Sequence, residues 1–576
     1  MDSRGRRCAG ARTQALSCRR GMDRRRPLRH ALWRTKFVYK INSVAEHAFF
    51  RVASGEFAQV SDGFPPPCSD ALRSRRGIGM CTRIRAQAHG WGRRFGLHAM
   101  AWLLVGAGAG VTGAANAALL TDAAARDVDR VMPPLRSATA LPQVQPSLAA
   151  TASVADGFAS PAFPRVTAEF ARFRARDAAL TLEQLPASRR RADPAAFAQM
   201  QRYLFNRYNG VTVVRTLSVD GHLFDCIPLS QQPGMRDVAR VASPPPRTGG
   251  PIAEPHQAAP ATRCNAGTVP LQRIGINDLA KAHSLREFLD KQPSSSDRGE
   301  RVTAAAASDG HHYASVFANT AGSPIHGAGA DLNIWTPVFR SSNDYMSISQ
   351  IWLYGQSASQ AQQTLEVGWQ LRPSYADWGD KSITFIYSTQ DGYATTGCHN
   401  LECGDFVQVV SGNVLGTPYP ADRYSSRGGK QTLLSVGYQR DADGNWWLML
   451  DGDWIGYYKA SLYSGDLATG SSAIGFSAGG ETYAEDLTPS TPMGSGAFAN
   501  AGYRNAAFQA NHFYLDASLA SHAVTRLSGY AVDDPACYTL ALAGLSGPSS
   551  TGVGSTALAP EMRSGGFYFG GPGCTP

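Results

Sequence analysis

Residues 364–371 have the sequence TLEVGWQL, and this alternating pattern predicts a β-strand. Successive side chains of a strand point to opposite faces, so Glu366, Gly368 and Gln370 would share one face. A carboxylate beside a glycine leaves room for the backbone of a ligand to approach, although a solvent-exposed sheet face explains the same pattern. The opposite, apolar face would comprise Leu365, Val367, Trp369 and Leu371.

Short strand-like runs with turn residues between them continue on both sides of this strand, from His311 to the end of the chain. Asp451-Gly452, between NWWLML and DWIGYY, is a strong β-hairpin signal. Many strands without intervening helices predict an antiparallel sandwich or barrel of about 270 residues. We expect a mainly β protein whose large C-terminal domain covers residues 305–576.

A smaller α+β domain is predicted upstream, over residues 166–300. Two helical patterns, from about Thr167 and from Ala195 to Asn206, precede a hairpin that turns at Asp220-Gly221. A further strand begins near Cys264, and NDLAKAHSLREFLDK predicts one helix capped by Asn277 or Asp278. Residues 118–165 are rich in Ala, Pro and Ser, so we expect a linker there. The polar stretch from Gln292 to Asp309 is a natural protease site.

The positive charge of the chain is concentrated in residues 1–117. The whole chain has 55 Lys+Arg and 45 Asp+Glu, and residues 1–117 hold 21 and 6 of them, which leaves 34 and 39 for the remainder. The rest of the chain is therefore slightly acidic, and we expect no nucleic-acid partner.

The same leader contains a predicted secretory signal. Arg93 and Arg94 precede an apolar run from Met100 that ends in Ala115-Asn116-Ala117, a small-x-small cleavage pattern. A transmembrane anchor is the alternative, but the run is short and rich in Gly and Ala. We expect export to the periplasm or the exterior, no membrane association after cleavage, and a monomer. Translation starting at Met80 or Met100 would explain the patternless residues before the signal.

Six cysteines remain after the leader, an even number that suggests disulfides in an exported protein. Sequence order suggests three pairs, although six cysteines allow fifteen connectivities. A zinc site is disfavoured because Cys398 and Cys403 have no second nearby pair and only His399 beside them. We therefore expect no metal and no organic cofactor. The suggested pairs are Cys226–Cys264, Cys398–Cys403 and Cys537–Cys574.

Several further motifs follow one another along the chain: SISQIWLYG, LEVGWQL, TGCHNLEC, NWWLML, GGE at 479–481, PMGSG at 492–496 and YFGGPG near the end. In this order they resemble the neprosin family of secreted glutamic peptidases, which includes a prolyl endopeptidase. Upstream, DGHLFDCIPLSQQP and CNAGTVPLQR resemble the activation domain of that family, and together the resemblance covers roughly residues 200–576. Two departures are the sequence IGFSA before Gly479, where plant members commonly have a Trp, and an insertion at residues 244–260.

The resemblance implies a β-sandwich with two catalytic glutamates across a cleft, which fall on Glu366 and Glu481. Glu485 and Asp486 are close enough in sequence to compete with Glu481. It also implies an upstream propeptide that packs over the cleft and makes the protein a zymogen with its own propeptide as partner. Candidates for the cleft wall are Gln350, Trp352, Tyr354, Gly368, Gly479 and Gly480.

A pair of carboxyl groups suits peptide hydrolysis, because one can activate water while the other protonates the leaving amine. Neighbouring like charges separate their pKa values, which supplies an acid and a base together, and such a site works best in acid. Gln370 is a candidate for holding the water or stabilising the oxyanion. The predicted function is a secreted acid endopeptidase acting on polypeptides, with cleavage after proline as the finer expectation.

Two other functions fit parts of the sequence. Two carboxylates in an aromatic-rich sandwich would equally describe a glycoside hydrolase. A non-catalytic carbohydrate-binding module would use Trp446, Trp447 and Trp454 as sugar platforms. A propeptide favours a peptidase over either. His311 and His312 are adjacent on a predicted strand and would face opposite ways, and no HExxH motif accompanies them, so we assign them no catalytic role.

Overall fold

The computed structural model describes residues 120–135, 163–247, 263–291, 310–374, 378–412, 415–547 and 554–574. The basic leader with its expected signal, most of the expected linker and the expected cleavage stretch at residues 292–309 lie outside these ranges. In the described part of the chain, no helix has the length and apolar character that crossing a membrane requires.

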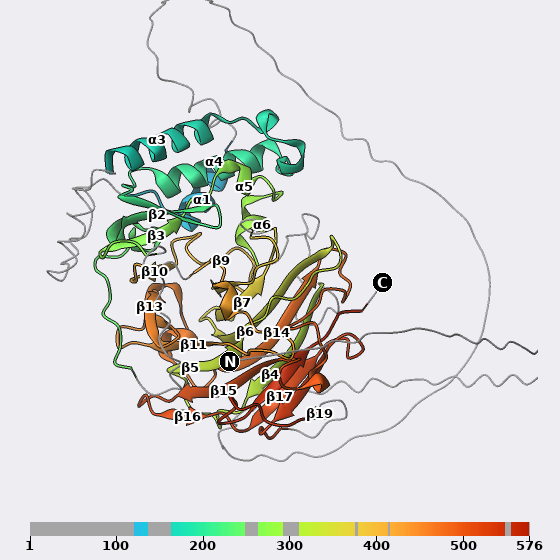
Figure 1. The fold of residues 1–576 in the computed structure, drawn as a ribbon. Coiled ribbons are helices and arrows are strands. Elements are labelled where there is room, and N and C mark those ends of the chain that lie inside the picture. The colour runs from blue at the N-terminus through green and yellow to red at the C-terminus, as the bar shows by residue number, and fades with distance from the viewer. Residues whose placement is uncertain are drawn as a thin grey trace, which may run out of the picture. The chain divides into compact units, whose positions relative to one another are not determined.

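A seven-stranded antiparallel sheet carries the TLEVGWQL segment as its strand β7 (Figure 1). Strand β6 lies between β7 and β14, so Glu366 and Glu481 stand on strands two apart. In spatial order the sheet contains β17 (Leu527–Val532), β4 (His311–Ala318), β14 (Gly475–Ala484), β6 (Asp344–Gln356), β7 (Gln362–Leu371), β8 (Ile383–Ser388) and β9 (Cys398–His399).

A ten-stranded sheet, antiparallel except for its last pair, forms the other layer. Its order is β10 (Phe406–Gln408), β13 (Asp453–Tyr458), β12 (Trp446–Leu450), β11 (Leu433–Arg440), β5 (Gly327–Asn333), β15 (Ala507–Leu515), β20 (Gly566–Gly570), β18 (Thr539–Ala543) and β19 (Gly554–Ser555), with β16 (Ser521–Ala523) beside β15. Short helical turns in this region are α7 (Asp466–Thr469), η8 (Ala421–Arg423), η9 (Ala460–Leu462) and η10 (Ala499–Ala501).

The two sheets pack face to face around a common apolar core. Trp369 on β7 is fully buried there, and its indole N–H donates to the carbonyl of Asn333 on β5 at 3.0 Å. Gln509 on β15 reaches the other sheet, where its amide N–H₂ donates to the carbonyls of Gln350 and Gly479 at 3.2 and 3.0 Å. The predicted mainly β fold with antiparallel sheets in a sandwich is confirmed.

An α+β domain precedes the sandwich and contains a three-stranded sheet with helices beside it (Figure 1). Its hairpin turns at Asp220 and Gly221, which have φ of 48° and 86°, the left-handed values that such a tight turn needs. The elements are α1 (Asp122–Val131), α3 (Phe163–Ala179), η3 (Leu182–Gln184), η4 (Ala187–Arg189), α4 (Pro194–Tyr208), β1 (Arg215–Val219), β2 (His222–Pro228), η5 (Leu229–Gln231), η6 (Pro233–Met235), β3 (Thr268–Gln272), α5 (Ile276–Leu279) and α6 (Leu285–Leu289).

Two features of this domain differ from the sequence-based expectation. Helix α1 lies inside the expected linker, capped by Thr121, with Val128 and Met132 buried in the core. The single helix expected over residues 277–291 is two helices, because the Ser284 side chain accepts a hydrogen bond from the Glu287 N–H and begins α6 separately.

The three disulfides suggested by sequence order are all present: Cys226–Cys264, Cys398–Cys403 and Cys537–Cys574. The first lies in the α+β domain and the other two in the sandwich. Cys537–Cys574 joins the chain just before β18 to the chain just after β20, so it closes the C-terminal end of the sheet.

Candidate active site

Glu366 and Glu481 lie on one face of the seven-stranded sheet, and both side chains are fully buried. A single ammonium group joins them: Lys291 Nζ lies 2.7 Å from Glu366 Oε2 and 2.9 Å from Glu481 Oε2. Because both oxygens are in contact with the same nitrogen, a water molecule at that position would also touch both carboxylates. The geometry therefore brings the two sequence-predicted glutamates together.

The second oxygen of Glu366 accepts hydrogen bonds from two hydroxyl groups. The Tyr393 hydroxyl donates to Glu366 Oε1 at 2.6 Å, and the Thr364 hydroxyl donates to the same oxygen at 3.0 Å. Tyr393 is in the loop between β8 and β9 and has a φ of 62°, a left-handed conformation that is uncommon for a tyrosine. These donors fix the orientation of the carboxylate.

Glu481 is held by three other side chains. Gln350 Nε2 donates to Oε2 at 2.8 Å, so this amide, expected only as a wall of the cleft, contacts a glutamate directly. His311 Nδ1 lies 2.7 Å from Oε1, and the Tyr313 hydroxyl donates to the same oxygen at 3.4 Å. Strand β4 supplies His311 and Tyr313, and strand β6 supplies Gln350.

The charges of the site reinforce one another. Burial alone would raise the pKa of Glu481, but the Lys291 charge and the hydrogen bond from His311 lower that pKa to about 2. Burial alone would lower the pKa of Lys291, but the charges of Glu366 and Glu481 outweigh it and raise that pKa. Buried charges are stable only when paired in this way, and here the pairing favours the charged forms of Lys291 and Glu481.

Of the expected water-positioning and wall residues, Trp352 lines the site: the Lys291 ammonium lies 5.9 Å from its ring centroid. Gln370 lies on the glutamate face by strand alternation and is fully buried, but neither of its amide atoms has a hydrogen-bond partner among the described residues. It therefore touches neither glutamate, and Gln350 is the amide that does. Tyr354 is partly exposed and packs over Gly475 near the end of β6.

The three glycines expected in the cleft wall have other roles. A Cβ at Gly368 would lie 2.0 Å from the Ser349 carbonyl oxygen, and one at Gly479 would lie 2.3 Å from the Ala314 oxygen, so both allow a close approach of neighbouring strands rather than of a ligand. A Cβ at Gly480 would meet Phe569 and Met493, so this residue faces the other sheet and the expectation for it is wrong.

The acidic residues after Glu481 do not compete with it. Glu485 is exposed, and Asp486 is exposed and accepts a hydrogen bond from the Asn343 side chain at 2.8 Å. Strand β14 ends at Ala484, so both residues follow it into a turn.

Sequence reasoning missed five contributors to the site: Lys291, His311, Tyr313, Thr364 and Tyr393. His311 was set aside because its neighbour faces the other way; that alternation is real, since His312 Nδ1 lies 2.7 Å from Asp534, but it leaves His311 on the glutamate face. Tyr393 lies in a loop with no periodic pattern, and Lys291 follows a short helix in another domain. Strand alternation is the signal that could have revealed His311, Tyr313 and Thr364.

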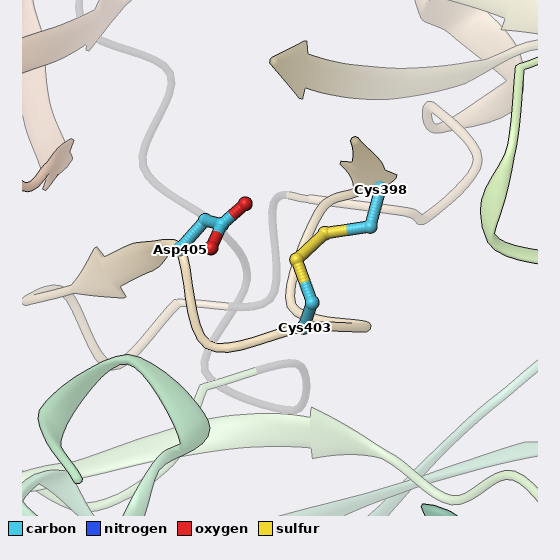
Figure 2. A group of neighbouring side chains, drawn as sticks. All are labelled: Cys398, Cys403 and Asp405. Carbon is cyan, nitrogen blue, oxygen red and sulfur yellow. A yellow bond between two sulfur atoms is a disulfide. The ribbon is translucent and has the colours of Figure 1, made fainter. Parts of the chain in front are cut away.

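Two alternative interpretations of the sequence, a carbohydrate-binding module and a zinc site, are not supported by the positions of most of the residues they need. Trp446 and Trp447 are completely buried in the sandwich, so they are not sugar-binding platforms, whereas Trp454 is partly exposed. Cys398, Cys403 and Asp405 gather closely, but Figure 2 shows that the two sulfur atoms are bonded to each other. The thiolates that a zinc ion would need are consumed in that disulfide.

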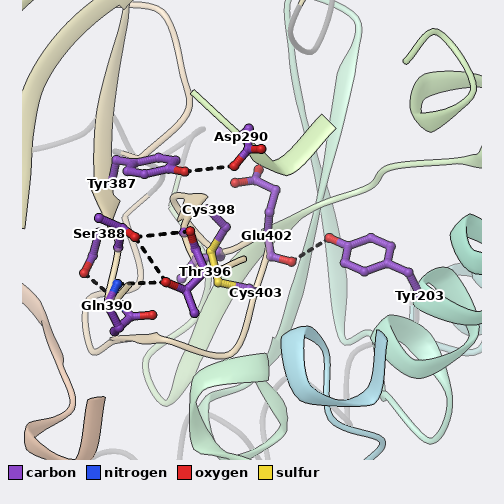
Figure 3. The surroundings of a disulfide bond; sticks show 12 residues. Tyr203, Asp290, Tyr387, Ser388, Gln390, Thr396, Cys398, Glu402 and Cys403 are labelled. Carbon is purple, nitrogen blue, oxygen red and sulfur yellow. Dashed lines mark hydrogen bonds between the residues drawn. A yellow bond between two sulfur atoms is a disulfide. The ribbon is translucent and has the colours of Figure 1, made fainter. Parts of the chain in front are cut away.

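The loop closed by the Cys398–Cys403 disulfide contacts the α+β domain (Figure 3). The Tyr203 hydroxyl on α4 donates to the Glu402 carbonyl at 2.6 Å, and Arg207 Nη1 donates to the Leu401 carbonyl at 2.9 Å. Nearer the glutamates, the Tyr387 hydroxyl lies 3.3 Å from the Asp290 carboxylate. The domain therefore binds along the edge of the sheet that leads to the glutamate pair.

Comparison with known proteins gives one family model and two similar solved structures. Residues 343–572 match the Neprosin family model. Among solved structures, a Scytalido-glutamic peptidase bound to a peptide-based transition-state analogue matches with 9% identity over 46% of this chain and 97% of that chain, with a TM-score of 0.21. SCP-B, a member of the eqolisin family of peptidases bound to the tripeptide Ala-Ile-His, matches with 8% identity over the same shares and a TM-score of 0.20.

Proposed function

We propose that this chain, whose residues 343–572 carry a Neprosin domain, is the precursor of an exported peptidase that uses Glu366 and Glu481. The observation that carries the proposal is the pair of buried carboxylates on one sheet face, close enough to contact one nitrogen atom. Nothing in the packing of the sandwich requires two charges there, and burying them without a function is costly.

In this mechanism, water takes the position that the Lys291 ammonium occupies. One carboxylate accepts a proton from the water as the oxygen attacks the substrate carbonyl carbon, and the other carboxyl group donates its proton to the leaving nitrogen as the C–N bond breaks. The Gln350 amide and the Tyr393 hydroxyl hold the two carboxylates in position. The products are a free carboxyl group and a free amine.

A preference for proline is part of the proposal. The Trp352 and Tyr393 rings both face the Lys291 ammonium, with centroids 5.9 and 5.8 Å from Nζ. Aromatic walls of this kind pack well against a pyrrolidine ring. A peptide library that contains proline at varied positions would reveal the preference through the cut sites.

The precursor is proposed to be inactive because Lys291 fills the site. Its side chain comes from the α+β domain, which acts as the propeptide, and it neutralises both catalytic groups at once. Cleavage between Gln292 and Asp309 would separate this domain from the sandwich and allow it to leave. Mass spectrometry that finds an intact and fully active precursor would contradict this part of the proposal.

The test of the catalytic pair uses the protein from Ala118 onward, processed at about pH 3 to 5 and mixed with the peptide library. We expect the wild type to cut, and Glu366→Gln and Glu481→Gln to lose activity by at least about a thousandfold. Glu485→Gln, an exposed change near the same strand end, is the matched control and should cut normally. A wild type that cuts no peptide but acts on a polysaccharide panel would favour the glycoside hydrolase instead.

A further inference from the structure

We infer that Arg372, Tyr387 and His399 form a binding strip for the main chain of the peptide substrate, on one side of the glutamate pair. This inference rests on the proposed peptidase function and adds the residues that recognise the substrate. The three side chains come from the end of β7, from β8 and from β9.

Three consecutive residues of the α+β domain occupy this strip. Arg372 Nη1 donates to the Asp290 carbonyl at 2.8 Å. The Lys291 backbone lies beside the Tyr387 hydroxyl, and the Leu289 backbone lies beside the His399 ring. These three contacts are to the main chain, which any peptide can supply. The Tyr387 hydroxyl also donates to the Asp290 carboxylate and accepts from Arg286 Nη2, each at 3.3 Å.

The bound segment runs into the glutamate pair, because the third residue in it is Lys291. A substrate that lay along the same strip would therefore bring its main chain to the carboxylates. Tyr387 is paired with Glu366 across β7 and β8, and His399 is paired with Tyr387 across β8 and β9, so these two side chains cross the sheet in line with Glu366. Arg372 follows the last residue of β7.

The strip is rigid before any substrate binds. The Arg372 guanidinium lies 4.8 Å from the Tyr345 ring centroid and also donates to the hydroxyl of that tyrosine. The Tyr387 ring packs edge-on against His399, with centroids 5.1 Å apart. Groups fixed in this way lose little conformational entropy when a ligand binds.

An unused amide on the same face supports the assignment. Gln370 is two residues before Arg372 on β7, is fully buried, and has no hydrogen-bond partner for its donor or its acceptor among the described residues. A buried amide left unpaired is costly, and a peptide main chain offers both an acceptor and a donor to complete it.

In the uncleaved chain, burial, helped by the nearby Arg372 charge, lowers the pKa of His399 well below its usual value. This favours the neutral imidazole, which has one donor and one acceptor. The ligand class is an extended peptide.

The test combines a variant with shortened substrates. Using the full chain after acid processing, kcat and KM are measured for a peptide and for versions truncated toward the cut site from each end. We expect Arg372→Met to lower kcat/KM about tenfold or more for the long peptide, mainly through KM, since a hydrogen bond to a charged group is lost. Truncation from one end only should abolish the difference between wild type and variant.

Arg340→Met, a change of an exposed arginine near the start of β6, is the control and should behave like the wild type at every length. Tyr387→Phe removes only a hydroxyl and repeats the test if Arg372→Met folds poorly. An equal loss at all lengths from both ends, or no loss at all, would overturn the strip while leaving the peptidase intact. A wild type that cuts none of the peptides would overturn both proposals.

Discussion

The two faces of β7 are equally buried, yet they are different kinds of surface. On one face Leu365, Val367 and Trp369 pack against the ten-stranded sheet and have no accessible surface. On the other, Glu366 and Gln370 are also inaccessible, but there a lysine from another domain binds the charge, and the amide has no partner in the described part of the chain. Burial alone therefore does not separate core from site. The distinction lies in whether the covering group completes an apolar surface or neutralises a charge.

The largest expected effect is on the apolar face. Trp369→Ala should lower the free energy of unfolding by about 3–5 kcal/mol, because it removes a large buried side chain and leaves a cavity. Thermal or denaturant unfolding of the processed protein would measure it, with the partly exposed Trp454→Ala as the smaller control. A negligible loss for Trp369→Ala would mean that the two faces of β7 do not differ as described.

Removing each of the two disulfides of the sandwich should affect stability and binding differently. In a chain-entropy model, losing Cys537–Cys574, which spans 37 residues, costs about 4 kcal/mol, and losing Cys398–Cys403, which spans 5, costs about 2 kcal/mol. We expect the second pair, changed to alanine, to weaken peptide and propeptide binding more than the first, because His399 lies inside its loop. Measurements on both double variants should give the lower unfolding midpoint for the variant without Cys537–Cys574 and the higher KM for the variant without Cys398–Cys403.

The charged face should respond to pH. The pKa of Glu481 is lowered from 4.5 to about 2 in the folded chain, so ionised Glu481 stabilises the fold fully above about pH 4.5, and this contribution is lost as the pH falls toward 2. The contribution is on the order of 3 kcal/mol. Lys291→Met removes its main cause, so the variant should unfold at a lower temperature than the wild type at pH 5, with a smaller gap at pH 2.5.

Lys381→Met is the control for that experiment, because Lys381 forms an exposed ion pair with Asp220 and such pairs contribute little. A gap between Lys291→Met and the wild type that stays constant from pH 5 to pH 2.5 would show that ionised Glu481 does not hold the lysine. Because the pKa of Glu481 is lowered, mild acid leaves this carboxylate ionised and paired with Lys291. Mild acid alone is therefore not expected to break the contact between them, and chain cleavage is the expected trigger.

The smallest expected effect concerns the loop that contacts Glu366. Tyr393→Phe keeps the ring and removes the hydroxyl that donates to Glu366, and we expect kcat to fall about tenfold with little change in stability. Steady-state kinetics with the processed enzyme would measure it. Tyr530→Phe on the edge strand β17 is the control, and equal kinetics for both variants would remove Tyr393 from the site.

The sequence predicted the parts of this molecule that depend on local pattern. Alternation along TLEVGWQL placed Glu366 and Trp369 on opposite faces, and Asp451-Gly452 forms a turn with φ of 46° and 83° between β12 and β13. Glu481 was identified through resemblance to a family, since no local rule links two strands more than a hundred residues apart.

The remaining features depend on long-range packing that leaves no periodic signal. Helix α1 forms in an Ala-rich stretch because Val128 and Met132 find a core to join. Tyr393 reaches Glu366 from a loop held by the Asp391 carboxylate, which accepts from the Thr396 N–H at 3.1 Å. Gly368 was assigned to a ligand, although the neighbouring strand explains it, because a glycine alone does not show what approaches it.

The hydrogen bonds of Gln509 have a consequence for engineering this protein. From the ten-stranded sheet, the Gln509 side chain donates to the carbonyls of Gln350 and Gly479. Gln350 is on β6 and contacts Glu481, and Gly479 is on β14, the strand that carries Glu481. A mutational screen limited to residues near the substrate would omit Gln509, yet small shifts there would move the reacting groups. Directed evolution of activity or temperature range would therefore find useful changes on β15, behind the catalytic surface.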